Sequence, residues 1–176
     1  MDTQRLAVGG DSAGGNLATV VALRARTEQL PVAFQALFYP STDVSRTDYP
    51  SYRQYGQDHW LTTTAVEKFR SFYLPDPRLW RHPEASPLLA ADDDLRLLPP
   101  PALILTAGCD PLRDEGRAYA DRLRAVGVDV EYRLEPEMIH ACLSLFNNAL
   151  YPDASRRVEP VLDALVRAVG AALATK

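Results

Sequence analysis

The sequence has little of what marks several common classes of protein. Its two cysteines allow at most one disulfide and show no CxxC or Cys/His spacing typical of a metal site. Lys and Arg total 19 against 23 for Asp and Glu, giving a net charge of −4, so we expect no nucleic-acid partner. Charges interrupt every apolar run of membrane-spanning length, and no apolar leader follows Met1, so we expect no membrane span and a cytoplasmic protein.

What is present is typical of one globular domain. The chain has 176 residues, of which 47% are hydrophobic and 24% charged, which is enough apolar surface to build a core. Short apolar runs alternate with helical patterns, and this alternation favours an α/β fold in which about four parallel strands carry helices on both faces. The expected strands are 5–8, 32–39, 102–106 and 129–134, and the expected helices are 16–26, 62–74, 114–126, 143–150 and 154–174.

The segment 41–98 is the least regular part of the sequence. Its prolines and aperiodic aromatic residues predict an irregular connection with one helix, which Thr62 to Thr64 would cap. The acidic run Asp92–Asp94 is interpreted as a solvated loop or helix start, because no other type of metal ligand stands at a suitable spacing beside it. Trp60 and Trp80 are interpreted as packing residues, with the lining of an acyl pocket as the alternative.

A nucleophile motif follows the first expected strand. Residues 10–14 read Gly-Asp-Ser-Ala-Gly, which matches G-x-S-x-G between an apolar strand and a helix. Small residues at both flanks let the chain reverse tightly, so that Ser12 projects from the strand end, where the backbone N–H of Ala13 can favour negative charge. A phosphate-binding loop and a purely structural turn are the alternatives, but neither G-x-G-x-x-G nor a P-loop Lys-Ser/Thr pair is present.

A serine hydroxyl needs a base and an orienting carboxylate to become a nucleophile. Of the three histidines, His140 follows the fourth expected strand and would reach the same sheet edge as Ser12, whereas His59 and His82 lie in the irregular segment.

The acid should lie between the serine and the histidine in this architecture. Asp110 satisfies that order just past a strand, while Asp114 and Glu115 are explained by capping and by the dipole of the following helix. Cys109 and Cys142 flank these residues and are expected to be small buried hydrophobes.

Four motifs in chain order resemble the bacterial hormone-sensitive-lipase-like carboxylesterases of the α/β-hydrolase fold. They are GDSAGG at 10–15, ASPLL at 85–89, DPLRDEG at 110–116 and MIH at 138–140. The resemblance spans nearly the whole chain and implies a catalytic triad of Ser12, Asp110 and His140. It also implies an oxyanion-hole donor at Ala13, no metal and no organic cofactor. The residues of the implied nucleophile elbow around the serine are Gly10, Asp11 and Gly14.

The chain departs from that family in two ways. The family usually continues His-Gly-Phe where this chain has His140, Ala141 and Cys142. Family members also carry an HGGG segment, several strands and cap helices before the elbow, and this sequence contains none of them. We therefore interpret residues 1–176 as a single truncated α/β-hydrolase domain, the C-terminal portion of the fold. Its first strand would expose an apolar edge, Arg5 to Val8, open to self-association or to a complementing chain.

The function implied by the resemblance is that of a serine carboxylic ester hydrolase. Its substrates would be small-molecule acyl esters of short to medium chain length, cleaved through an acyl-enzyme. Loss of one oxyanion donor costs roughly a hundredfold to a thousandfold in rate, so a catalytically impaired fragment that folds or associates without turnover is the alternative. An amidase or another acyl hydrolase with the same triad also remains open.

Overall fold

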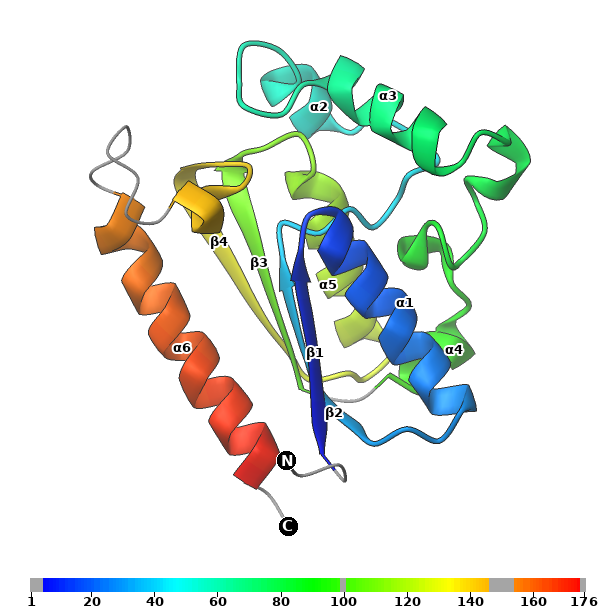
Figure 1. Cartoon of the computed structure of the whole chain (residues 1–176), viewed down its shortest axis with the longest axis vertical. Coiled ribbons are helices and arrows are strands. Elements are labelled where there is room, and N and C mark those ends of the chain that lie inside the picture. Colours follow the sequence, from blue (N-terminus) through cyan, green and yellow to red (C-terminus); the bar gives the residue numbers. More distant parts are fainter. Residues whose placement is uncertain (1–4, 99–100, 146–153, 175–176) are drawn as a thin grey trace.

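A four-stranded parallel sheet forms the centre of the molecule. The computed structural model describes residues 5–98, 101–145 and 154–174. The strands β1 (Leu6–Asp11), β2 (Val32–Phe38), β3 (Ala102–Cys109) and β4 (Val130–Ile139) are hydrogen-bonded in chain order, each parallel to the next (Figure 1). This confirms the predicted α/β class and its four parallel strands, with β1 at one edge of the described sheet.

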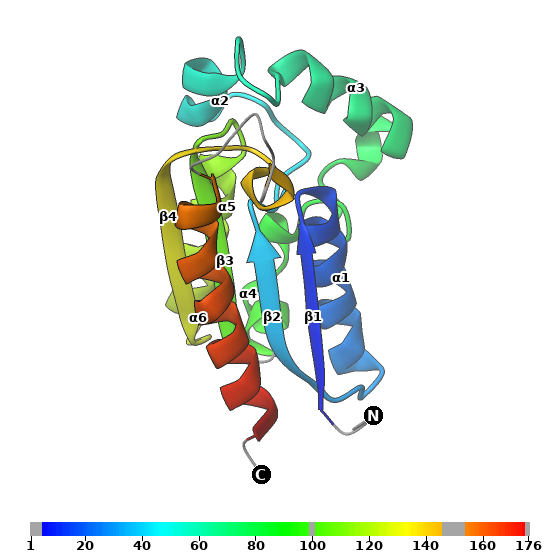
Figure 2. The same ribbon diagram turned by 60° about the vertical axis from the view of Figure 1, so that its left-hand side comes forward.

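Helices cover both faces of the sheet, as predicted. On one face α1 (Ala13–Thr27) and α5 (Arg113–Ala125) bury Ala22 and Leu123 against Ile104 of β3. On the other face α6 (Ala154–Ala174) buries Val158 and Val161 against the strands (Figure 2). The near-continuous apolar runs of β2 and β3 follow from this arrangement, because successive side chains of a strand point to opposite faces and both faces are covered.

The connection between β2 and β3 contains more helix than the single one predicted. The expected helix is α3 (Thr63–Tyr73), where Thr62 Oγ1 accepts a hydrogen bond from the N–H of Ala65 at 3.1 Å. Two further short helices, α2 (Pro50–Tyr55) and α4 (Asp92–Arg96), correct that prediction. They are too short to show a helical period in sequence. Figure 1 shows α2 and α3 above the ends of the strands at which the candidate site lies.

The fourth strand is longer than predicted, and its end matters for the site. It runs to Ile139, so the expectation that it ends at Leu134 is wrong. From the pair Ala107–Glu135 to the pair Cys109–Ile139, β3 advances two residues while β4 advances four. The strand therefore bulges around Pro136, and an interior proline is tolerated at a bulge because it cannot donate a ladder hydrogen bond. At the expected helix 143–150, Cys142–Leu145 form a 3₁₀ turn, and the remainder lies outside the described residues.

Candidate active site

Ser12 stands at a sharp turn between β1 and α1. Its backbone has φ 55° and ψ −120°, a conformation that a non-glycine residue rarely adopts and that is found at strained functional turns. The N–H of Ser12 donates to the carbonyl of Phe38 at 2.9 Å, which fixes the turn to the end of β2. Gly10 is required for steric reasons, because a Cβ there would lie 2.3 Å from the carbonyl oxygen of Gly14.

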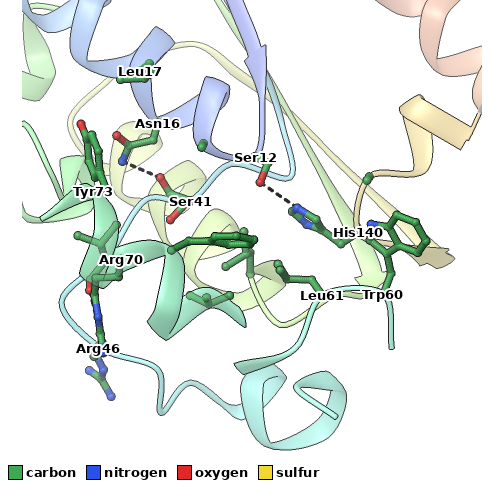
Figure 3. A pocket seen from close by; sticks show the side chains of 16 residues that line it. Ser12, Asn16, Leu17, Ser41, Arg46, Trp60, Leu61, Arg70, Tyr73 and His140 are labelled. Atoms are coloured by element: carbon green, nitrogen blue, oxygen red, sulfur yellow. Dashed lines mark hydrogen bonds between the residues drawn. The ribbon is translucent and has the colours of Figure 1, made fainter. Parts of the chain in front are cut away.

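The three predicted residues come together at the carboxyl edge of the sheet. His140 Nε2 lies 2.9 Å from Ser12 Oγ, and His140 Nδ1 lies 2.7 Å from Asp110 Oδ2. Figure 3 shows the contact between Ser12 and His140 at the wall of a cavity. Because Cys109 pairs with Ile139, the residues that follow each of them, Asp110 and His140, leave neighbouring strands side by side.

Asp110 is fully buried and uses both carboxylate oxygens. One accepts a hydrogen bond from the backbone N–H of Leu112 at 2.9 Å, and the other faces Nδ1 of His140. A carboxylate can only accept, so this contact places the imidazole proton on Nδ1 and leaves Nε2 free to accept the proton of the Ser12 hydroxyl. In this chain of contacts each proton is therefore donated in the direction that activation of a serine requires.

The loop after His140 keeps the backbone geometry that glycine favours. Ala141 has φ 64°, in the left-handed region. The hormone-sensitive-lipase-like carboxylesterases usually have glycine at this position of the sequence. The imidazole itself is almost completely buried and packs edge to face against Tyr39, with ring centroids 5.0 Å apart. The alanine thus preserves the path of the loop at a cost in backbone strain.

The other histidines and Asp114 lie outside this arrangement. Nδ1 of His59 contacts the carbonyl of Gln57, and Nδ1 of His82 accepts from the N–H of Glu84. Asp114 accepts from the N–H of Ser51 at 2.8 Å and does not cap α5. The capping part of the explanation for Asp114 and Glu115 is therefore wrong, although both residues lie in the first turn of α5, as the dipole part expects.

Glu115 is a buried residue whose role the sequence reading missed. The oxygens of its carboxyl group accept from the backbone N–H groups of Thr42 and Asp43 at 2.8 and 3.2 Å, and from the hydroxyl of Tyr52 at 3.1 Å. Burial raises its pKa from an ordinary value to about 8. The signal in the sequence was helical spacing, since Glu115 lies four residues before the buried Tyr119 on the same face of α5.

The hydrogen bonds of Glu115 anchor the loop at Thr42 and Asp43, which lies beside the nucleophile; we call this contact the Glu115 anchor. The N–H of Ser41, next to the anchored Thr42, donates to the carbonyl of Ser12 at 3.2 Å. From the other side, Nδ2 of the buried Asn16 donates to the carbonyls of Ser41 and Ala85, both at 2.9 Å. The loop at Ser41 and Thr42 is thus bonded to the turn at Ser12, to Asn16 of α1 and to Glu115 of α5.

A cavity of about 480 Å³ opens at the hydroxyl of Ser12. Ala13, whose backbone N–H begins α1, is part of its wall, and most of the remaining wall consists of apolar side chains. Trp60 lines the cavity, whereas Trp80 donates its indole N–H to the carbonyl of Leu74, so the two tryptophans differ in role. An apolar cavity that meets a few converging polar groups is typical of small-molecule sites.

The two cysteines are free, with Cys142 buried and Cys109 partly exposed. Burial raises the pKa of the Cys142 thiol to about 12, so it stays protonated at neutral pH. Among the described residues, no three His, Cys, Asp or Glu side chains are grouped to hold a metal ion. Within the same part of the chain, no helix combines the length and the apolar character needed to cross a bilayer.

Comparisons with known proteins identify relatives of the chain. Carboxylesterase NlhH of Mycobacterium tuberculosis is 38% identical over 172 residues, which cover 97% of this chain and 53% of that protein. Ethyl acetate hydrolase of Pseudomonas putida is 37% identical, covering 94% and 51% respectively. The chain therefore spans about half the length of the relatives that it matches.

Solved structures agree with these relatives. EstE1, a thermostable carboxylesterase cloned from a metagenomic library, superposes with a TM-score of 0.88 at 35% identity, covering 99% of this chain and 57% of that one. A thermostable esterase of Pseudomonas putida gives a TM-score of 0.78 at 41% identity, covering 86% and 48%.

A family profile described as the alpha/beta hydrolase fold matches residues 1–144. This match contains all four motifs on which the resemblance was based. The chain therefore belongs to the α/β-hydrolase family, and its resemblance to the hormone-sensitive-lipase-like carboxylesterases is confirmed.

Proposed function

We propose that this chain carries the catalytic triad of a serine carboxylic ester hydrolase that cleaves short- to medium-chain acyl esters. The observation that carries the proposal is the continuous line of contacts from Ser12 through His140 to the buried Asp110, at 2.9 and 2.7 Å. The names of the relatives, a carboxylesterase and an ethyl acetate hydrolase, support ester bonds as the target.

The proposed reaction proceeds in two halves. Ser12 Oγ attacks the ester carbonyl while Nε2 of His140 takes its proton, and Asp110 stabilises the imidazolium that forms. His140 then returns the proton to the departing alcohol, leaving an acyl group on Ser12. Water attacks this acyl-enzyme with His140 again as base, releasing the carboxylic acid and restoring the serine. The N–H of Ala13 would donate to the carbonyl oxygen when it carries negative charge.

The cavity supports the substrate size in this proposal. At about 480 Å³ it falls within the range of small-molecule pockets, and apolar side chains such as Leu17, Val66 and Phe69 line it. An alkyl chain of a few carbons would gain about 0.8 kcal/mol for each methylene that these walls remove from water.

Hydrolysis of p-nitrophenyl butyrate by the purified chain tests the activity. We expect turnover that is lost in Ser12→Ala, whose fold is checked by circular dichroism. A folded chain without turnover would favour the alternative of a catalytically impaired fragment. The corresponding p-nitroanilide separates an esterase from an amidase.

The partner and location of the protein also belong to this proposal. We infer that the Arg5 to Val8 edge mediates self-association or receives a complementing chain, because β1 pairs with β2 on one side only within the described sheet.

A cytoplasmic location is proposed because charges interrupt the apolar runs of the sequence, and cell fractionation tests it.

A further inference from the structure

The cavity beside Ser12 has an uneven distribution of charge. Among the residues that the structure describes, its wall contains two arginines, Arg46 and Arg70, and neither aspartate nor glutamate. Figure 3 shows both arginines on the side of the cavity away from His140. A group bound at Ser12 that extends across the cavity would therefore approach positive charge.

The two arginines differ in how their charge is compensated. Arg46 is half exposed and forms an ion pair with Asp48 at 2.5 Å. Arg70, on α3, has no carboxylate within ion-pair distance among the described residues. One guanidinium nitrogen of Arg70 donates to the carbonyl of Val44 at 3.1 Å, and its Nε is buried with no hydrogen-bond partner in that part of the chain.

The surroundings hold the Arg70 guanidinium in place. It stacks on Trp80, with Cζ 3.9 Å from the ring centroid, and the bond to Val44 fixes its other edge. Arg70 is half-buried and has no carboxylate partner among the described residues, and its guanidinium offers donors that match a carboxylate. A fixed cation of this kind also loses little side-chain freedom when a ligand binds.

We propose that Arg70 is a specificity-determining residue that selects esters carrying a carboxylate at the end remote from the scissile bond. This inference rests on the proposed esterase function and names its substrate class. Monoesters of dicarboxylic acids fit it, since the apolar wall would receive the methylene chain while Arg70 pairs with the free carboxylate. We assign the charged end to the acyl part, because this part stays bonded to Ser12, in the wall of the cavity, after the alcohol leaves.

Binding without turnover tests this selectivity. In the Ser12→Ala protein, calorimetry compares monoethyl adipate with monoethyl adipamate, whose terminal amide has the same shape and no charge. We expect the carboxylate to bind about 10- to 100-fold more tightly, the effect of a hydrogen-bonded charge pair. Equal binding of the two ligands would overturn the proposal, whether or not the active chain hydrolyses any ester.

Variants locate the origin of the preference. Arg70→Gln should abolish it, whereas Arg78→Gln, at an exposed arginine outside the cavity, should leave it unchanged. Arg46→Gln should change it by less than about fivefold, because exposed ion pairs contribute little. A preference that persists in folded Arg70→Gln protein contradicts the assignment. If that variant does not fold, equal binding of the two ligands to the protein with Arg70 unaltered still overturns the proposal.

A second pair of ligands distinguishes the acyl side from the alcohol side. The acetate ester of 5-hydroxypentanoate carries the carboxylate on its alcohol part, and its terminal amide is the neutral control. We expect no preference for the charged member of this pair. Tighter binding of the charged member of this second pair, together with equal binding of monoethyl adipate and monoethyl adipamate, would contradict the acyl-side assignment. Labelling of Ser12 by a neutral fluorophosphonate reports on the proposed esterase function separately.

Discussion

At the scale of single residues, the two glycines of the G-x-S-x-G motif differ in how closely the turn around Ser12 packs against them. A Cβ on Gly10 would lie 2.3 Å from a backbone oxygen, while a Cβ on Gly14 would meet nothing closer than the Asp11 carboxylate at 3.8 Å. The expectation that small residues are needed at both flanks thus has a steric basis at Gly10 only.

Gly10→Ala should therefore destabilise the chain and Gly14→Ala should not. Because the overlap at residue 10 is with backbone, we expect a loss of about 3 kcal/mol in the free energy of unfolding. Gly14→Ala should change it by less than about 1 kcal/mol, since alanine suits a helix. Urea denaturation of both variants measures the difference, and equal values would contradict this account of the turn.

The strain at Ala141 gives a second prediction. Glycine adopts φ near 64° without the steric cost that alanine meets there. Ala141→Gly should raise the free energy of unfolding, by up to about 1 kcal/mol after the greater freedom of glycine in the unfolded chain is deducted. Thermal unfolding measures this. Ala107→Gly, in the middle of β3, is the control and should lower stability.

At the scale of elements, the sequence predicted the order of strands better than their ends. Apolar runs of β2 and β3 marked buried strands, and Gly10 to Gly14 marked the turn that follows β1. The end of β4 could not be predicted, because Pro136 usually breaks a strand and here lies in a bulge. A bulge arises from the pairing of two strands, and the hydrophobic pattern of one strand carries no information about that pairing.

The predicted site shows the same limits. Motif and chain order were enough to bring Ser12, Asp110 and His140 to one edge, because parallel strands end together. The Glu115 anchor was missed because charged residues in a first helical turn usually complement the dipole. Its burial results from tertiary packing of α5 against the loop at Thr42 and Asp43.

The Glu115 anchor predicts how stability depends on pH. The pKa of this carboxyl is about 8 in the folded chain and near 4.5 when unfolded, so unfolding releases a proton between those values. The free energy of unfolding should therefore fall as pH rises from about 5 to 8, with a contribution of up to about 1.4 kcal/mol per pH unit.

Glu115→Gln should remove that part of the slope. Its amide oxygen can still accept from the N–H groups of Thr42 and Asp43, and no proton is then linked to unfolding. Denaturation at a series of pH values measures the slope, with Glu67→Gln, at an exposed carboxylate, as the control. If Glu115→Gln keeps the original slope, the anchor does not hold its proton in the folded state.

At the scale of the whole molecule, the sheet edge and the cavity are linked by Ser12. β1 forms one edge of the described sheet and leads directly into the turn that carries the serine, so a strand that pairs along the whole of β1 would reach the neighbourhood of the site. Self-association through this edge should make the apparent mass rise with protein concentration in light scattering. Ala7→Lys, at an exposed position of β1, should suppress that rise. A constant monomer mass in the unaltered chain would contradict self-association.

The rate at which a neutral fluorophosphonate labels Ser12 tests the central claim most directly, because this reagent reacts with a serine that a neighbouring base activates. We predict that the folded chain is labelled at Ser12 and that His140→Ala slows labelling about a hundredfold or more. If the folded chain is not labelled, or if His140→Ala is labelled at the unaltered rate, the contacts among Ser12, His140 and Asp110 do not form a working triad.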